Sequence, residues 1–146
     1  MTEVRFKRLR ENATVPMRGS KDAAGWDLYA CINEPIVIEP HTTAKIPTGI
    51  ATELPSGTFG GVVARSGLAT KYGIRVCQGL AVIDSDYRGE WFVPLHNDTD
   101  ETFTLNPYER IAQLIVIPYL DIKFTEVEEL SDTVRGCGGF GSTGVM

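Results

Sequence analysis

The stretch TGIATELPSGTFGGVVA, residues 48–64, decides the fold class. Its first seven residues alternate in the manner of a β-strand and stop at Pro55-Ser56-Gly57, which is a turn sequence. A second strand is predicted over residues 59–64. Eight prolines are scattered along the chain, and they argue against long helices. The stretch therefore indicates short strands joined by tight turns.

The same pattern recurs along the whole chain. Further strands are predicted at residues 36–38, 74–77, 80–83, 91–95, 102–105, 111–117 and 122–125, and after the small-residue turn that precedes residue 26. One helix candidate interrupts them, with Ser66 as N-cap, residues 68–72 as its turns and Gly73 just past its end. Many short strands with turn signals indicate a sandwich, a jelly roll or a barrel. We therefore expect an all-β fold with one short helix.

The composition excludes several classes of protein. The chain has 146 residues, with 14 basic and 19 acidic side chains and a net charge of −5. No apolar run approaches the ~20 residues that span a bilayer, so we expect no membrane partner. The acidic balance argues against a stable nucleic-acid partner. Two histidines do not suffice for a His-rich zinc site. No signal peptide is visible, and three widely spaced cysteines predict reduced thiols and a cytoplasmic location.

The chain is predicted to divide into a domain and an arm. Residues 1–127 carry the strand pattern, and residues 128–146 begin as a polar stretch that leads into a glycine-rich end. Five of the 15 glycines lie in the last eleven residues, so this end cannot be part of a core. It is either a flexible terminus or a device that closes over a ligand.

The glycine-rich end RGCGGFGSTG, residues 135–144, allows several interpretations. It satisfies GxGxxG, but the dinucleotide fingerprint must open a helix within a βαβ unit, and here the sequence stops. It resembles a P-loop without the lysine. Glycine N–H groups can nevertheless bind phosphate oxygens. Arg135, Ser142 and Thr143 add donors and Phe140 a flat face for a base, which favours ligand closure over a frayed end.

An acidic turn follows an apolar strand in AVIDSDYRGE, residues 81–90. Asp84 comes directly after Ile83, which is predicted to be buried, so its carboxylate can be held rigidly as a base at the rim of a pocket. On spacing alone, a polar β-turn is the favoured interpretation. Asp84 and Asp86 could also bind a metal, but two carboxylates are too few to specify one.

Three other segments place polar side chains beside apolar strands. Arg65 and Ser66 begin the predicted helix, where free N–H groups bind anions, although Ser66 could merely cap the helix. Asp27 is either a turn residue or a carboxylate that supports a site from behind. A buried Arg110 needs a carboxylate partner. Gln113 either faces a ligand or satisfies backbone groups.

Taken together, five segments resemble the trimeric deoxyuridine triphosphate nucleotidohydrolases, the dUTPases. They are AGWDLYA (24–30), RSGLA (65–69), VIDSDYRGE (82–90), RIAQLIV (110–116) and RGCGGFGSTG (135–144). The resemblance implies a distorted jelly-roll or β-clip-like barrel, a homotrimer with three shared sites, and a requirement for Mg²⁺. It also implies hydrolysis of dUTP to dUMP and pyrophosphate, which limits dUTP and supplies dUMP for thymidylate synthesis.

The resemblance further assigns roles to the residues around the base and the sugar. Asp84 is implied to orient and deprotonate the water that attacks the α-phosphorus. Tyr87 is implied to pack against the deoxyribose and exclude a 2′-hydroxyl. The uracil edge would be read by the hairpin residues Gln78, Leu80, Val82 and Ile83.

Around the phosphates, the resemblance assigns a second set of residues and the arm. The phosphates would be held by Arg65, Ser66, Gly67 and Gln113. The site would be closed, from a neighbouring subunit, by Arg135, Phe140, Gly141, Ser142 and Thr143. Asp27 would reach the magnesium ion through water, and Arg110 would be structural.

Three positions depart from the family pattern. Gln78 stands where asparagine is frequent, Ala81 where glycine is usual, and Cys137 where the residue is more often polar; the first two bear on uracil recognition and the third makes the lid oxidisable. Two alternatives stay open. One is a dCTP deaminase of the same fold, although such enzymes carry a glutamate base in the equivalent hairpin. The other is a non-catalytic nucleotide-binding trimer.

Overall fold

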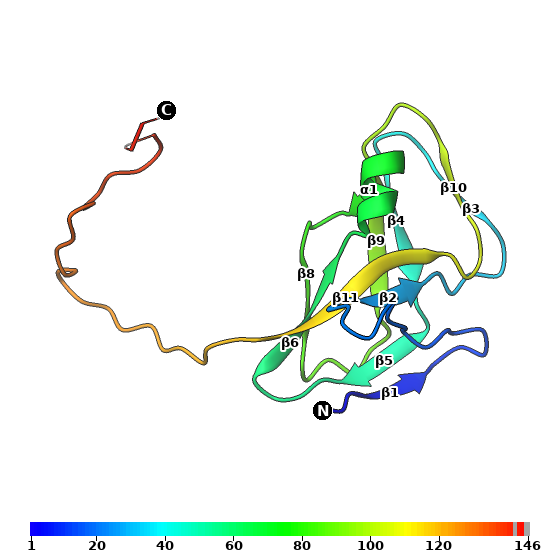
Figure 1. Ribbon diagram of the computed structural model, residues 1–146, viewed down its shortest axis with the longest axis horizontal. Coiled ribbons are helices and arrows are strands. Elements are labelled where there is room, and N and C mark those ends of the chain that lie inside the picture. The colour runs from blue at the N-terminus through cyan, green and yellow to red at the C-terminus, as the bar shows by residue number, and fades with distance from the viewer. Residues whose placement is uncertain (142, 145–146) are drawn as a thin grey trace.

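A computed structural model describes residues 1–141 and 143–144 and shows a β-rich body with an extended C-terminal segment (Figure 1). Within those residues there is a single helix, so the prediction of an all-β, jelly-roll-like fold with one short helix is confirmed. The elements are β1 (Arg5–Arg8), β2 (Trp26–Tyr29), β3 (Ile36–Ile38), β4 (Thr43–Pro47), β5 (Ile50–Glu53), β6 (Thr58–Val63), α1 (Ser66–Tyr72), β7 (Ile74–Val76), β8 (Ala81–Asp84), β9 (Phe92–Asn97), β10 (Phe103–Leu105) and β11 (Arg110–Pro118).

The strands form four small antiparallel sheets. The largest has the order β2-β11-β6-β8, and a second has the order β4-β9-β7. Two strand pairs, β1-β5 and β10-β3, complete the body. Neighbours in each sheet are mostly distant in sequence, which is the pattern expected when a jelly roll is wound from short strands.

One apolar core lies between these sheets. Its largest side chains include Trp91, Leu28 and Ile46, each at most 1% exposed. Gly60 of β6 lies against this core, because a Cβ there would be 3.0 Å from the Trp91 ring and 3.1 Å from Leu114. The glycine therefore lets β6 approach the tryptophan, and a side chain at this position would overpack the core.

Two strands were not predicted, and one predicted strand is absent. All four residues of β1 are exposed and show no apolar alternation. In β4, Ala44 and Ile46 do alternate with polar residues, but the strand is short and ends at Pro47. The strand predicted at residues 122–125 is wrong for this structure, because the segment pairs with no described strand and its side chains are exposed. Alternation needs a second strand before it yields a ladder.

The short helix differs from its prediction at one end. Gly73 ends it with a left-handed φ of 65°, and its N–H donates to Ala69 O at 3.1 Å, as predicted for a C-terminal glycine. Ser66 is the first helical residue rather than the N-cap, which is Arg65, and no side chain caps the helix. Among the described residues no helix is long and apolar enough to cross a membrane.

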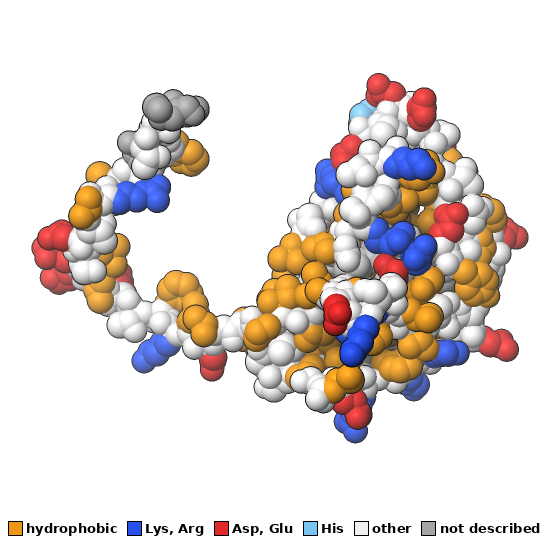
Figure 2. Space-filling view, in the orientation of Figure 1, with side chains coloured by type: hydrophobic (Ala, Val, Ile, Leu, Met, Phe, Trp, Pro, Cys, Tyr) orange, Lys and Arg blue, Asp and Glu red, His pale blue; other side chains and the backbone are white. Residues whose placement is uncertain are grey.

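The C-terminal segment leaves the body where β11 ends. The N–H of Tyr119 donates to Gly57 O at 3.1 Å, and the Tyr119 ring lies 6.5 Å from that of Phe59. Beyond it the chain extends away from the sheets, and its apolar and acidic side chains are exposed (Figures 1 and 2). From here on we call residues 119–144 the arm.

Candidate active site

One group of predicted site residues lies where β2, β11 and β6 run side by side. Gln113 of β11 is opposite Asp27 of β2 and Val63 of β6. Its amide donates to Ala64 O at 3.0 Å. A Cβ on Gly25 would collide with the Gln113 side chain, so this position must be glycine for the amide to lie here. Gln113 thus satisfies a backbone carbonyl, which was one of its two predicted roles.

Asp27 joins two arginines in this group. Arg65 Nε donates to Asp27 Oδ1 at 3.0 Å, and Arg110 Nη1 donates to Asp27 Oδ2 at 3.4 Å. The predicted carboxylate partner of Arg110 is therefore Asp27, but the Arg110 side chain is 50% exposed rather than buried. Because Asp27 holds only part of the Arg65 guanidinium, the remaining N–H groups can bind an anion.

Ser66 and Gly67 follow Arg65 directly and are exposed at the first turn of α1. A Cβ added at Gly67 would meet no atom of the described residues within 4 Å, so the backbone there is open to solvent. Together with Arg65 and Gln113, they place a guanidinium, a hydroxyl, backbone N–H groups and an amide near one edge of the sheet. These donors suit phosphate oxygens. We call Asp27, Arg65, Ser66, Gly67 and Gln113 the candidate phosphate-binding group.

A second group of predicted residues lies on the loop between β7 and β8, on β8 and on the turn after it. The loop links two different sheets, so it is not the hairpin that the resemblance implied. Gly79 has a left-handed φ of 76° in this loop, and Gln78, Leu80 and Val82 are exposed around it. Ile83 packs partly against the core. The exposed strand edge and its turn leave backbone groups available to a planar ligand.

Asp84 stands at the end of β8, opposite Phe59 of β6. Its side chain is exposed and forms no ion pair or hydrogen bond with the described residues. Tyr87 follows in the turn, where its N–H donates to Asp84 O at 3.1 Å and its hydroxyl donates to Glu90 O at 2.9 Å. The Asp84 carboxylate and the Tyr87 ring are thus both exposed to solvent within the same turn. We call residues 78–87 the base group.

The two groups are separated within one chain. Gln113 lies opposite Val63 while Asp84 lies opposite Phe59, four positions along β6 and on its other flank. In a regular sheet this spacing puts the two Cα atoms about 16 Å apart. No hydrogen bond or ion pair links the groups within residues 1–141 and 143–144. A single chain therefore does not bring Asp84 and Gln113 together.

The arm is separate from both groups. Arg135 Nε donates to Gly138 O at 2.8 Å within the arm itself, and the Phe140 side chain is fully exposed. Gly141 has a φ of 75°, and Thr143 is exposed. Ser142 lies outside the described residues. The described lid residues thus lie on an arm that extends away from β8 and α1 of their own chain (Figure 1).

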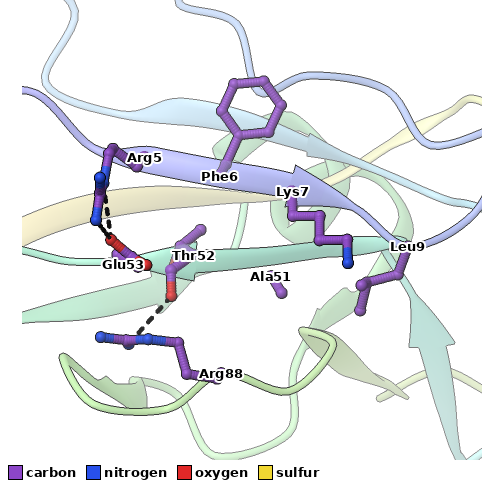
Figure 3. A pocket seen from close by; sticks show the side chains of 8 residues that line it. All are labelled: Arg5, Phe6, Lys7, Leu9, Ala51, Thr52, Glu53 and Arg88. Atoms are coloured by element: carbon purple, nitrogen blue, oxygen red, sulfur yellow. Dashed lines mark hydrogen bonds and ion pairs between the residues drawn. The ribbon is translucent and has the colours of Figure 1, made fainter.

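A cavity of about 300 Å³ lies between β1, β5 and the loop after β8 (Figure 3). It is lined by Arg5, Phe6, Lys7, Leu9, Ala51, Thr52, Glu53 and Arg88, none of which was predicted as a site residue.

The described residues contain no cluster of three or more His, Cys, Asp or Glu side chains that could hold a metal. The isolated carboxylates of the site therefore fit Mg²⁺ only as it is bound with nucleotides, where one or two carboxylates contribute and water and the phosphates supply most ligands. Asp27 fits such a water-mediated role, because each of its oxygens accepts one hydrogen bond and retains a second lone pair.

The sequence did not predict two residues that support the base group. Glu90 accepts the Tyr87 hydroxyl on its backbone oxygen, and its carboxylate pairs with Arg10. Glu90 closes the segment VIDSDYRGE, so its position in a motif was a usable signal. Arg10 lies 80 positions away in a charged N-terminal stretch, where no pattern marks it.

The geometry is that of a β protein with one group of side chains and backbone N–H groups suited to an anion, and an exposed carboxylate at the end of β8. Comparison with known proteins makes this more specific. The dUTPase family model matches residues 11–144. The dUTP nucleotidohydrolase of Desulfitobacterium hafniense is 44% identical over 144 residues, covering 98% of this chain and 95% of the relative. That of Paramecium bursaria Chlorella virus 1 is 46% identical over 145 residues, covering 99% of this chain and 100% of the relative. The chain belongs to the dUTPase family.

Solved structures agree with this assignment. A variant of the Staphylococcus bacteriophage 80alpha dUTPase, solved with dUpNHpp, has a TM-score of 0.89 at 29% identity and covers 99% of this chain and 100% of its own. A variant of the dUTPase from phage phi11 of S. aureus, described with a structural Mg(II) ion, has a TM-score of 0.79 at 26% identity, covering 88% and 98%.

Proposed function

We propose that this protein hydrolyses dUTP to dUMP and pyrophosphate, with Asp84 as the base that orients and deprotonates the attacking water. The observation that carries the mechanism is the exposed Asp84 carboxylate at the rigid end of β8, without an ion-pair partner in the described residues and beside the turn of Tyr87. A carboxylate without a cationic partner is free to accept a proton from water. Water attack on the α-phosphorus then releases pyrophosphate, and the reaction removes dUTP while supplying dUMP for thymidylate synthesis.

Each group has a part in this reaction. The loop before β8 and the strand itself, with Gln78, Leu80, Val82 and Ile83, read the uracil edge, and the Tyr87 ring packs against the deoxyribose. The candidate phosphate-binding group binds the triphosphate through Arg65, Ser66, Gly67 and Gln113. Positioning and charge stabilisation account for most of the catalysis in reactions at phosphorus, so these contacts carry a large share of the rate.

Magnesium is the proposed cofactor. When bound to the triphosphate, the ion neutralises part of its charge and fixes its conformation. Asp27 is the residue of this chain that would contact the hydrated ion, while it also orients Arg65. This assignment explains how a chain with a net charge of −5 binds a polyanion without an extended basic surface.

A homotrimer is the proposed working unit. The separation of about 16 Å between the Cα atoms of Asp84 and Gln113 is one support, because adjacent subunits can bring the two residues together. The arm is the other support. Its apolar residues Leu120, Ile122 and Phe124 are 66–92% exposed and alternate as in a strand that lacks a partner. A second subunit supplies such a partner, and Arg135, Phe140, Gly141, Ser142 and Thr143 then reach its site.

We further propose a cytoplasmic location and the division into a domain of residues 1–127 and a C-terminal lid of residues 128–146, which contains the distal part of the arm. The last strand ends at Pro118, and the residues that follow it have exposed side chains, which supports the arm. Cys31, Cys77 and Cys137 are free thiols, and such thiols persist in a reducing compartment.

The test is a pyrophosphate-release assay with purified protein, Mg²⁺ and dUTP. Asp84→Asn should lower kcat by about 10²–10⁴-fold, the usual effect of removing a general base. Asp86→Asn, in the same turn, is the matched control and should stay within a few-fold of the parent. Equal activity of the Asp84→Asn variant and the parent would reject the mechanism. Release of ammonia from dCTP would support a deaminase, and binding of dUTP without turnover a regulatory trimer.

A further inference from the structure

The Tyr87 ring is held in one place by contacts within its own loop. A Cβ on Gly89 would lie 2.6 Å from Tyr87 Cζ and 2.7 Å from Cε1, so the ring rests directly on the Gly89 backbone. Its hydroxyl donates to Glu90 O at 2.9 Å, and its N–H donates to Asp84 O. The position of the ring therefore depends on where the backbone at residues 89 and 90 lies.

Glu90 is in turn fixed from two directions. Its carboxylate accepts Arg10 Nε at 2.5 Å and Arg10 Nη2 at 2.9 Å, a bidentate pair in which the Glu90 side chain is only 12% exposed. The next peptide is held as well, because the Trp91 N–H donates to Ile50 O at 2.8 Å. The hydrogen bond to Glu90 raises the pKa of Arg10, so the guanidinium stays charged.

Arg10 can hold Glu90 in place because the backbone around Arg10 is itself held by hydrogen bonds. The preceding residue, Leu9, donates its N–H to Gly49 O at 2.7 Å, and Arg10 O accepts the Ala13 N–H at 3.1 Å. The N-terminal segment thus forms a platform beside β5. From this platform the guanidinium reaches across to the loop after β8.

We propose that Arg10 is a positioning residue for sugar recognition: by holding Glu90, it sets the position of the Tyr87 ring and thereby the discrimination between deoxyribonucleoside and ribonucleoside triphosphates. This inference rests on the proposed function, in which Tyr87 packs against the deoxyribose. Arg10 does not touch the substrate in this account. It acts through the Glu90 carboxylate and the Glu90 carbonyl that receives the Tyr87 hydroxyl.

The physical basis is steric. A ring in van der Waals contact with C2′ leaves no room for a 2′-hydroxyl, and that hydroxyl would also lose its hydrogen bonds to water. Loss of the ion pair lets the loop relax by tenths of an ångström to an ångström, and the ring then clears the hydroxyl. Binding of the triphosphate itself should change little, because Arg10 is not among the residues proposed to bind it.

The experiment compares two matched arginines on the same N-terminal segment. Arg10→Met removes the pair with Glu90, and Arg5→Met removes a similar pair with Glu53, which lies across β1 and β5 beside the cavity (Figure 3). For each variant, kcat/KM is measured with dUTP and with UTP. We expect Arg10→Met to lower the dUTP/UTP ratio about tenfold, as for loss of one shape-determining contact, and Arg5→Met to leave it unchanged.

Two further variants separate positioning from loss of folding. Arg10→Lys keeps the charge but not the bidentate geometry, so it should recover part of the ratio. In a Tyr87→Phe background, where the hydroxyl can no longer bond to Glu90 O, Arg10→Met should have little additional effect on the ratio. Thermal unfolding of each variant shows whether it is folded.

The outcomes distinguish this inference from the proposed function. If the parent does not hydrolyse dUTP, the proposed function is wrong, and the inference goes with it. If the parent hydrolyses dUTP in preference to UTP and the ratio is the same in Arg10→Met and Arg5→Met, only the role of Arg10 is wrong. An unaltered effect of Arg10→Met in the Tyr87→Phe background would likewise overturn the route through the hydroxyl.

Discussion

The loop after β8 and the C-terminal arm both carry predicted site residues, but they are stabilised in opposite ways. Contacts within the chain hold the loop: Arg88 Nη1 donates to Ser85 O at 2.7 Å and to Thr52 O at 3.3 Å, and Glu90 pairs with Arg10. Beyond Tyr119, the hydrogen bonds printed for the described arm residues join only one another, as in the bond from Arg135 to Gly138.

The difference shows which steps a single chain can prepare. The loop holds the backbone at Asp84 and the Tyr87 ring in place within one chain. In the proposed function, little ordering entropy then opposes the use of this loop. The proposed closure of the arm would instead cost conformational freedom, which contacts to substrate and to another subunit would have to offset. The proposal thus assigns the pre-formed part of the site to the loop and the part that closes to the arm.

The largest expected effect comes from mixing two inactive variants. Asp84→Asn removes the proposed base, and Arg65→Ala removes a proposed phosphate ligand, so each variant alone should be nearly inactive. If adjacent subunits share each site, co-refolding equal amounts should restore about a quarter of the parent activity, because random assembly combines an intact Asp84 with an intact Arg65 at that frequency. Pyrophosphate release measures the recovery.

The control for this experiment is a chain that carries both substitutions. When it is mixed with Asp84→Asn, no subunit retains Asp84, so activity should stay at the background. If the two single variants also stay at the background after co-refolding, and size-exclusion chromatography shows mixed oligomers, then each chain uses its own Asp84 and Arg65. The trimer would in that case not be required for catalysis.

Deletion of residues 135–146 is the next largest effect. Turnover should fall at least about a hundredfold, because the variant lacks the proposed lid that excludes water and positions the triphosphate. The melting temperature should stay close to that of the parent, because the Phe140 side chain and its neighbours bury no surface in the body. Steady-state kinetics and calorimetry on the same preparation test both statements. Full activity of the shortened chain would disprove the role of the arm as a lid.

The same contrast explains what the sequence could predict. Strands such as β5 and β11 were predictable, because alternation and apolar runs record burial directly. The exposed residues of β1 carry no such record, and its backbone pairing with β5 depends on the rest of the fold. The apolar alternation at residues 122–125 was detected, but a strand also needs a partner, which sequence alone does not supply.

The sequence likewise predicted only part of the site. The motifs identified Asp84, Arg65 and Gln113 as candidates through their resemblance to a family. Spacing could not show that Asp27 binds both Arg65 and Arg110, because the second contact spans 83 positions. Pairing of side chains across such distances is a product of the three-dimensional fold.

The smallest expected effect is a matched pair of glycine substitutions, one in each region. Gly89→Ala would bring a methyl group against the Tyr87 ring, which must move, whereas Gly139→Ala meets no atom within 4 Å. Because the Tyr87 ring is half exposed and can shift outward, the loss of stability for Gly89→Ala should be about 1 kcal/mol, at the low end for overpacking. Gly139→Ala should leave the melting temperature unchanged. Calorimetry of both variants decides the matter: equal shifts would mean that the arm is packed against protein as tightly as the loop is, which would contradict the separation of pre-formed and conditional parts of the site.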